Sequence, residues 1–513
     1  MPVIYTKAFF LFVAFIFNVV TVAVVMGILE NKGKIKLSIL RSKTRDAELS
    51  FFPKFCSSKA ITSYVVTLAI VSAAFLNFAM PFQFMLFGLV AVIVFFNYSS
   101  KLTMGWQKYD PSRFAKKLFT TALLIRLFYV IFIYFYYIEM TGQPDMFHPG
   151  DTLWYQFMAS RWREEGFDSF NKWVSGTQLD DIGYCWWLGI ENFLFGTHVL
   201  PPRLIKCVID SFACLLIYSL AQRNFGESTA RIAAIFYMLM PNTWYYCGIT
   251  LKETEMAFLV ILFVERGDLA MRSPKIKLKD MLIPLLIIVV MFTFRTAIAA
   301  VLAAALAAAL ILSSQKQMQL WKKIMFTAIF SVWMFLTVGV ELTQEAQMMW
   351  EGKMENQEVG YMSRSTQEGG NALAKYASAS VFAPLIFTLP LSSMVDIPNQ
   401  ENQMMMNGAN FIKNVLSGFT VFALFILLIR KEWRQHVLPL AVMCGYLVVL
   451  VFSNFAHSER FHYPILGFEL LFAAYGVSLM TNKHKRWYII WLVVVCVANV
   501  GWALVKLRGR GWA

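Results

Sequence analysis

The sequence predicts an all-α polytopic membrane protein, and three observations support this fold class. Hydrophobic residues make up 58% of the 513 residues and charged residues only 15%, whereas a soluble domain carries about 25% charge. The apolar residues come in runs of about 17 to 22, long enough to cross a bilayer as helices. Lys and Arg gather in every second loop between these runs. The composition excludes disordered, fibrous and disulfide-rich secreted proteins.

Fourteen candidate spans follow one another along the chain. Two of them, 281–294 and 296–313, are short and are separated only by Arg295. A further apolar stretch, 379–393, ends in Pro and Ser residues and is interpreted as a re-entrant or interfacial segment. The spans are 8–29, 61–79, 82–98, 118–138, 204–221, 231–247, 251–265, 281–294, 296–313, 324–340, 411–429, 437–453, 463–480 and 487–505.

The distribution of basic residues orients the spans. Segments 139–203 and 341–410 hold only 7 of the 46 Lys and Arg residues but 17 of the 31 Asp and Glu residues, which predicts that they face away from the cytoplasm. Lys7, Lys506, Arg508 and Arg510 do not fit, and one missed or surplus span near either end would resolve this. The predicted cytoplasmic loops hold 29 basic residues and are 30–60, 99–117, 222–231, 266–280, 314–323, 430–436 and 481–487.

The net charge of +15 therefore reflects topology, and we expect no nucleic-acid partner because no recognition motif accompanies it. Span 8–29 lacks a cleavage site of small residues and is expected to be retained. The seven cysteines form no CxxC pair and are expected to be buried small hydrophobes. No metal-binding or redox framework is visible among them.

Segment 139–203 carries the first candidate site residue. Pro149–Gly150 predicts a turn, and the stretch that follows is amphipathic, as expected of a helix in the membrane interface. Asp151 lies at its start, where it could cap the helix or act on a substrate arriving from the bilayer, and the two roles are compatible. The apolar face of this helix comprises Leu153, Trp154, Phe157, Met158 and Trp162.

Asp180 and Asp181 form a second acidic feature of this segment. Paired carboxylates can bind a divalent metal or share acid–base work, and the alternative is a turn cap before the next apolar stretch. The sequence identifies no cofactor with certainty. A divalent metal remains possible, with Asp151 and Asp181 as the candidate ligands.

Four stretches in a fixed order resemble the GT-C superfamily of membrane glycosyltransferases, in particular its protein-mannosyltransferase-like branch. They read GDTLWYQFMA, LFGTHVLPPRLIKCVID, LAQRNFGESTARIAAIFYMLMPNTWYYCGITLKETEMAFL and SERFHYPILGFELLFAAYG. The resemblance covers about residues 118–505, which hold eleven spans. It implies a GT-C-like catalytic core there, with outer loops 139–203 and 341–410, and an N-terminal addition of about three spans in 1–117.

The resemblance also implies a chemistry. Such enzymes transfer a sugar from a polyprenyl phosphate to an acceptor on the non-cytoplasmic face, with an Asp of the first outer loop as general base. By position that residue is Asp151, and Tyr155 on the same stretch is a substrate-binding candidate. Many members have a second acidic residue directly after the Asp, whereas this chain has Thr152, which puts a metal-bridging role in doubt. Glu253, with Glu255 as second choice, is the counterpart of another acidic residue in the family, and the resemblance makes Glu253 the second catalytic candidate.

Two cationic residues are expected near the same face. Lys252 precedes Glu253 directly, and the alternative is a local pair between Lys252 and Glu255. Arg295 lies at the predicted outer turn of a helical hairpin, where it should meet a phosphate or a carboxylate unless it reaches the headgroups instead.

Segment 454–464 holds the last candidates. Arg460 resembles the phosphate-binding Arg of the family, and a planar guanidinium binds phosphate bidentately. Either His457 or His462 could add a hydrogen bond. The alternative is a surface contact between Arg460 and Glu459. The polar segment 341–410 could be a mobile cover for the site or a simple connection.

The resemblance therefore implies an inverting glycosyltransferase that uses a polyprenyl-phosphate-linked sugar and a glycan, lipid or protein acceptor. A bacterial inner membrane, with the site on its periplasmic face, is the expected location. A lipid-linked polysaccharide polymerase or O-antigen ligase is the near alternative, because the His residues and the 341–410 loop suit it. A transporter or lipid flippase is the distant one, and it predicts inverted repeats with charges at the bilayer midplane.

Overall fold

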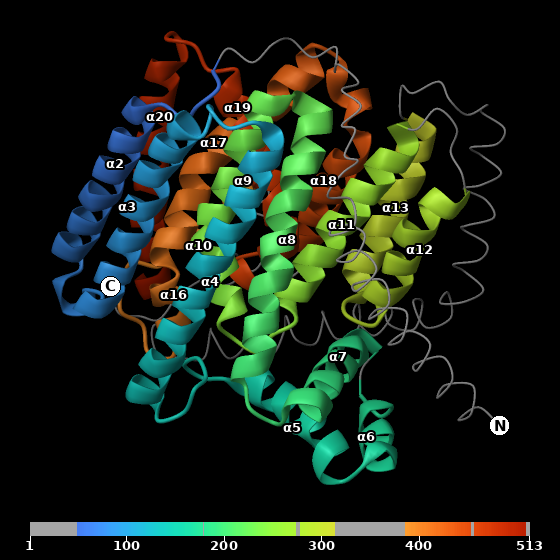
Figure 1. The fold of residues 1–513 in the computed structure, drawn as a ribbon. Helices are drawn as coiled ribbons and strands as arrows, with labels where there is room; N and C mark the ends of the chain where they lie inside the picture. Colours follow the sequence, from blue (N-terminus) through green and yellow to red (C-terminus); the bar gives the residue numbers. More distant parts are fainter. Residues whose placement is uncertain (1–48, 178, 273–277, 313–384, 453–455, 509–513) are drawn as a thin grey trace.

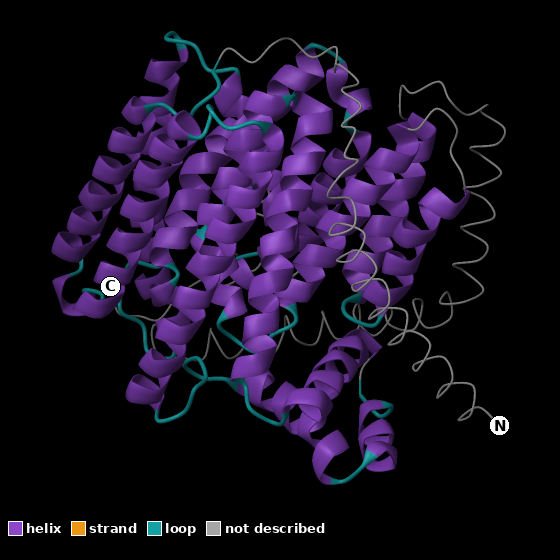
Figure 2. Ribbon diagram, in the orientation of Figure 1, coloured by secondary structure: helices purple, strands orange, loops and turns teal. Residues whose placement is uncertain are grey.

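The computed structural model describes residues 49–177, 179–272, 278–312, 385–452 and 456–508. Within these residues the regular structure is helical (Figure 2), with seventeen α-helices and two short 3-10 helices. This confirms the predicted all-α fold class. The predicted spans 8–29 and 324–340 lie outside the described residues, as does most of segment 341–410.

The helices form one bundle, and three of them project from one end of it (Figure 1). The first half comprises α2 (Lys54–Ala74), η1 (Leu76–Phe78), α3 (Phe82–Gly105), α4 (Pro111–Thr141), α5 (Gly150–Glu164), α6 (Phe167–Val174), α7 (Leu179–Phe195), α8 (Leu200–Phe225), α9 (Glu227–Leu239) and α10 (Pro241–Cys247). The second half comprises α11 (Glu253–Arg272), α12 (Leu278–Phe292), α13 (Thr296–Leu312), α16 (Glu401–Met405), α17 (Asn407–Ile429), η3 (Glu432–Gln435), α18 (Val437–Phe452), α19 (Glu459–Ser478) and α20 (His484–Arg508).

Among the described residues, six helices are long and apolar enough to cross a membrane, namely α2, α3, α4, α8, α17 and α20, and α12, α13 and α18 contain shorter apolar stretches. Large apolar side chains point outward from α4, as lipid-facing positions require; they include Leu124, Phe128, Ile131 and Phe135. Charged residues interrupt α11 and α19, which are the buried centre of the bundle.

The predicted span 231–247 is two helices. Proline lacks a backbone N–H and favours the first helical position, and Pro241 occupies that position in α10 after an extended Met240. The predicted span 251–265 also differs, because α11 continues to Arg272 in the expected cytoplasmic loop. Asp268 bonds to Arg272 in that last turn, with an Nε–Oδ1 distance of 2.9 Å, and so stabilises it.

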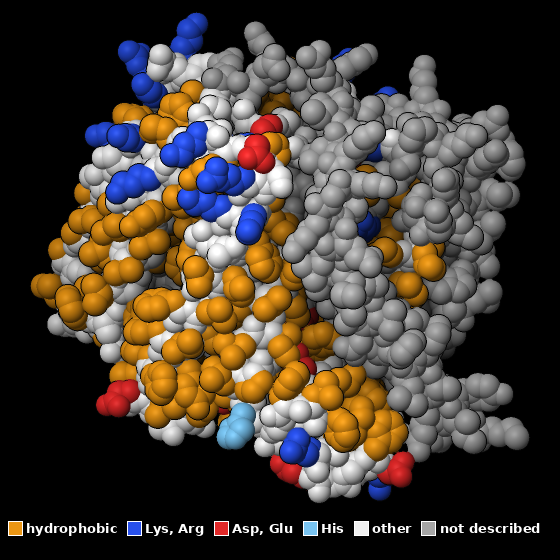
Figure 3. All heavy atoms as spheres, viewed as in Figure 1, with side chains coloured by type: hydrophobic (Ala, Val, Ile, Leu, Met, Phe, Trp, Pro, Cys, Tyr) orange, Lys and Arg blue, Asp and Glu red, His pale blue; other side chains and the backbone are white. Residues whose placement is uncertain are grey.

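Basic residues mark one end of the bundle. The connections α3–α4, α8–α9, α17–α18 and α19–α20 lie opposite the projecting helices α5–α7 (Figure 1), and Lys and Arg gather at that end on the face shown in Figure 3. Lys506, which did not fit the charge pattern, lies at the other end of α20. Its ammonium is engaged by Ser393, Gln400 and Gln403 at 2.8–2.9 Å.

The helices of residues 49–117 pack on the rest of the bundle. Helix α2 contacts α20, and α3 contacts α9 and α17. The contact with α17 is close, because a Cβ at Gly408 would lie 2.5 Å from the carbonyl oxygen of Gly88. Tyr64 on α2 also donates a hydrogen bond to Asn407 on α17 at 2.5 Å.

Segment 385–397 runs without regular helix between the helices, with Leu389, Ser392 and Val395 buried. Irregular backbone at membrane depth has to be satisfied by protein groups. Here Asn414 donates to the carbonyls of Thr388 and Pro390, and Asn499 accepts from the Ser392 amide at 2.7 Å. The described part of the predicted re-entrant stretch 379–393 is thus buried inside the protein.

Candidate functional site

Charged residues from five parts of the chain meet where α5–α7 join the bundle. They come from the first turn of α5, the first turn of α7, the start of α11, the α12–α13 turn and the first turn of α19. We call these six residues the outer charge cluster; they are Asp151, Asp181, Lys252, Glu253, Arg295 and Arg460.

Arg460 is the centre of the cluster. Its Nε donates to Oε1 of Glu253 and its Nη1 donates to Oδ2 of Asp151. Arg295 is a second cation near the same carboxylate oxygen, with its Nη2 3.7 Å from Oε1 of Glu253, and its guanidinium stacks over the ring of Phe461 at 4.3 Å. The structure therefore brings the predicted Asp151, Glu253 and Arg460 into direct contact, although 309 residues separate the first from the last.

Asp151 does not cap its helix. Helix α5 begins at Gly150, the cap position is Pro149, and no side chain caps it. Its carboxylate contacts Arg460 and is 59% exposed, whereas the side chain of Glu253 is fully buried. The two carboxylates on one guanidinium thus differ in their access to a substrate.

A second group of contacts adjoins the first. Lys252 Nζ lies 2.6 Å from Oδ1 of Asp181 and also donates to the carbonyl of Asp180 at 2.7 Å. Tyr155 donates to the same Asp181 oxygen. Burial, followed by the charge of Asp181, raises the pKa of Tyr155 well above its ordinary range, so the phenol stays protonated as a donor. Lys252 pairs with Asp181 rather than with Glu255.

Close packing holds α7 in place. The amide of Gly183 donates to the carbonyl of Thr293 at 2.8 Å, and a Cβ at Gly183 would lie 2.2 Å from Oγ1 of Thr293. Because Thr293 belongs to the turn that carries Arg295, this glycine sets the position of Asp181 relative to the α12–α13 turn.

Two buried cations of α8 anchor the loops that carry the cluster. Arg203 donates to the carbonyl of Pro144 at 2.5 Å and to Asp145 at 2.6 Å, before α5. Lys206 donates to the carbonyls of Ile249 and Leu251, before α11. Sequence reasoning missed this function, although the stretch LPPRLIK placed both residues at the start of a span, where cations need partners.

The two histidines of segment 454–464 have other partners. His457 stacks on the ring of Trp502 with a centroid distance of 4.8 Å. His462 Nε2 lies 2.9 Å from the carbonyl oxygen of Ala456, and its Nδ1 lies 2.8 Å from Nζ of Lys413. Because the carbonyl only accepts, Nε2 carries the proton and Nδ1 accepts from Lys413. The alternative surface contact of Arg460 with Glu459 does not form among the described residues, because Arg460 pairs with Asp151 and Glu253.

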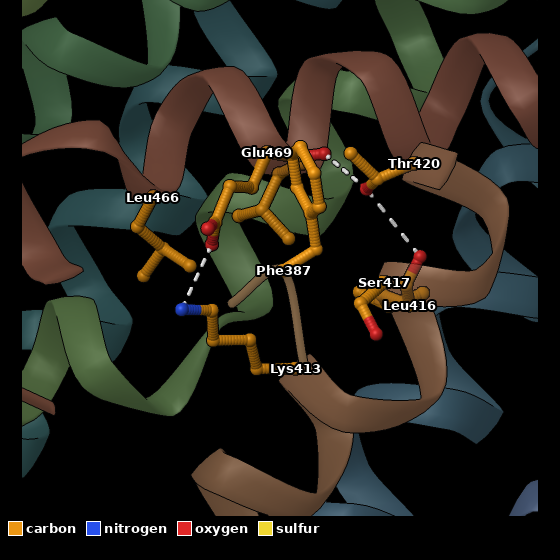
Figure 4. Close-up of a pocket in the computed structure, with 8 residues that line it drawn as sticks. Phe387, Lys413, Leu416, Ser417, Thr420, Leu466 and Glu469 are labelled. Atoms are coloured by element: carbon orange, nitrogen blue, oxygen red, sulfur yellow. Dashed lines mark hydrogen bonds and ion pairs between the residues drawn. The ribbon is translucent and has the colours of Figure 1, made fainter. Parts of the chain in front are cut away.

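Lys413 belongs to a buried polar site that the sequence reasoning missed (Figure 4). Its Nζ lies 3.2 Å from Oε2 of Glu469 and 2.6 Å from the carbonyl of Leu389. A small cavity of about 10 Å³, roughly the room that one water needs, adjoins this pair. It is lined by Phe387, Lys413, Leu416, Ser417, Thr420, Leu466, Glu469 and Leu470.

We expect Lys413→Met to lower the stability of the protein by about 3–5 kcal/mol, because it leaves the buried Glu469 without its cation. The Lys413→Met/Glu469→Leu double variant should recover most of this loss, since an apolar pair of similar volume replaces a buried ion pair at little cost. Thermal unfolding in one detergent, arranged as a double-mutant cycle, measures both. A double variant as unstable as the sum of the single ones would contradict a direct coupling.

The side chains of the outer charge cluster are poorly suited to bind a metal ion. Among the residues that the structure describes, no group of three or more His, Cys, Asp and Glu side chains is arranged to hold an ion. The two candidate ligands are each engaged by a cation, Asp151 by Arg460 and Asp181 by Lys252. The described residues therefore do not fit a metal site.

The comparisons with known proteins bear on the C-terminal part of the chain. No curated protein and no solved structure matches the chain. Residues 377–507 match the model of the Alg9-like mannosyltransferase family, which is a GT-C type family of membrane glycosyltransferases. The match includes Arg460 and helices α17 to α20. It supports glycosyltransferase activity by an integral membrane protein, and over residues 377–507 it confirms the resemblance of the chain to GT-C type membrane glycosyltransferases.

Proposed function

We propose that the protein transfers a sugar from a polyprenyl phosphate to an acceptor hydroxyl at the non-cytoplasmic face of its membrane. The observation that carries the proposal is the contact of Arg460 with both Asp151 and Glu253 beside the helices that project from the bundle. A carboxylate base and a phosphate-binding guanidinium therefore lie within one small site, as displacement at a phosphate-linked sugar requires. The expected location is a bacterial inner membrane, with the site on its periplasmic side.

The reaction is a single displacement. The acceptor oxygen attacks the anomeric carbon while its proton passes to Asp151, and the bond between that carbon and the phosphate oxygen breaks. The polyprenyl phosphate leaves with one more negative charge, which Arg460 and Arg295 stabilise. One displacement inverts the anomeric configuration. Asp181, Lys252 and Tyr155 border the site and would contact the sugar or the acceptor.

The geometry gives less support to the alternatives. A polymerase or ligase that depends on Arg and His gains nothing from His457 and His462, which are engaged by Trp502 and Lys413. A transporter requires charges along a pathway. The deep pair Arg126–Asp210 has an Nε–Oδ2 distance of 2.5 Å and both side chains are fully buried, so this pair lines no described opening.

The proposal is tested by measuring which donor the purified protein uses, a lipid-linked sugar or a nucleotide-linked sugar. The name of the matched family makes mannose the first sugar to try. Purified protein in lipid nanodiscs should transfer mannose from polyprenyl-phosphate mannose to acceptors extracted from membranes, and it should not use a nucleotide-linked mannose. The anomeric configuration of the product, read by NMR, should be inverted. Transfer from the nucleotide sugar alone, or retention of configuration, would contradict the proposal.

A further inference from the structure

Both sides of the Arg460 guanidinium are occupied by carboxylates that are not equivalent. Glu253, on Nε, is fully buried and has Arg295 as a second cation 3.7 Å away. Asp151, on Nη1, is 59% exposed, and within the described part of the chain its carboxylate pairs with no other cation. One of the two contacts of Arg460 is thus held inside the protein and the other faces solvent.

The two contacts should differ in how easily a ligand replaces them. Ion pairs in contact with water are weak because solvent and salt compete for both partners. Removing a partner from a buried pair is costly, because the charge that stays behind is not solvated. A phosphate binds a guanidinium through two parallel hydrogen bonds, so a phosphate on the Nη1–Nη2 side competes with Asp151 and leaves Glu253 in place.

We propose that the phosphate of the donor replaces Asp151 on Arg460 and thereby releases this carboxylate to act as the base. This inference rests on the proposed function and adds the order in which the donor binds and the base becomes available. While Arg460 holds Oδ2 of Asp151, that oxygen is engaged by the guanidinium rather than by an acceptor hydroxyl. Donor binding therefore precedes activation of the acceptor, and the base is available only when a leaving group is in place.

The charge balance of the site agrees with this exchange. The outer charge cluster holds three carboxylates, Asp151, Asp181 and Glu253, and three cations, Lys252, Arg295 and Arg460. A sugar–phosphate diester brings one further negative charge. Release of Asp151 toward solvent lets the diester take over the neutralisation of Arg460, so the buried part of the site stays balanced. The exchange thus requires a donor lipid that carries an anionic group.

The exchange predicts that removal of the Asp151 carboxylate strengthens binding of the lipid phosphate, whereas loss of a catalytic residue usually leaves ligand affinity unchanged or weaker. We expect Asp151→Asn to bind polyprenyl phosphate in nanodiscs about twofold to fivefold more tightly than the wild type, the range of a weak ion pair, because the Asp151 partner is exposed to solvent. Asp151→Ser serves as a second variant in case asparagine keeps a hydrogen bond to Arg460. Glu164→Gln is the matched control, because it removes the same charge from an exposed position on α5.

Polyprenol, which lacks the phosphate, is the uncharged control ligand. Tighter binding of polyprenyl phosphate by both Asp151 variants, with Glu164→Gln like the wild type, supports the exchange. Equal or weaker binding by the Asp151 variants overturns it, as does an equal gain in Glu164→Gln, which would be a general charge effect. A wild type that transfers sugar while the Asp151 variants gain no affinity refutes the exchange alone. A wild type that binds polyprenol as well as polyprenyl phosphate refutes the proposed function too.

Discussion

Replacing Asp151 by asparagine is expected to lower kcat/KM for sugar transfer by about 10²- to 10⁴-fold, the usual contribution of a positioned general base. Asparagine keeps the size of the side chain and can still contact Arg460, but it cannot take the proton of the acceptor. Little loss of stability is expected, because the carboxylate is 59% exposed. Transfer from polyprenyl-phosphate mannose by the purified variant, next to its thermal unfolding, measures both.

Two further variants make this result specific. Asp151→Glu keeps a carboxylate on a longer side chain and should retain part of the activity, whereas Glu164→Gln on the exposed side of α5 should behave as the wild type. Activity of Asp151→Asn within a few-fold of the wild type would show that another group, or no group, removes the proton. The assignment of Asp151 as the base would then be wrong.

The sequence was sufficient to predict that the site residues lie at one end of the bundle, because a residue at the end of a membrane span can lie on only one of two sides. Once the basic loops orient the spans, Asp151, Glu253, Arg295 and Arg460 all fall at the same end of the bundle. The lateral arrangement could not be predicted, because it depends on which helices are neighbours. Two contacts between helices produce the observed arrangement. Helix α8 packs against α11, which brings the anchors Arg203 and Lys206 to the loops. Gly183 approaches Thr293 closely, which places Asp181 beside Lys252.

Proximity along the chain does not bring the histidines of segment 454–464 into contact with the outer charge cluster, because they contact Lys413 and Trp502 instead. From the sequence alone, segment 454–464 is expected to connect two spans, with Arg460 and either His457 or His462 binding one ligand. Helix α19 begins at Glu459, and residues two positions apart on a helix point in directions about 200° apart. Arg460 therefore faces the cluster while His462 contacts Lys413. A Ser before an acidic residue and an apolar run was a helix-start signal that the sequence already contained.

The sequence also indicates that one side of α17 is polar. They recur at helical spacing in an otherwise apolar span, as Asn407, Asn410, Lys413, Asn414 and Ser417. Polar residues on one side of a span indicate contact with protein rather than with lipid. In the structure, the polar side of α17 contacts the irregular segment 385–397. This contact could not be predicted from the sequence, because segment 385–397 has no helical pattern.

The largest combined effect is expected for Arg460, because this residue serves both the structure and the chemistry. Arg460→Gln should lower transfer by about 10²- to 10³-fold through loss of charge stabilisation at the leaving phosphate. It should also destabilise the protein by about 1–3 kcal/mol, because the buried Glu253 loses its donor and keeps only Arg295 at 3.7 Å. Transfer kinetics and thermal unfolding of the same preparation separate the two losses.

The companion variants test whether the two roles of Arg460 are independent. Arg460→Gln/Glu253→Gln removes the unpaired buried charge, so it should regain stability without regaining transfer. Arg460→Lys keeps the charge but cannot contact Glu253 and Asp151 through one planar group, so it should remain well below the wild type in transfer. If the double variant regained activity together with stability, the loss in Arg460→Gln would be structural, and the phosphate would have to be held by Arg295 or Lys252 instead.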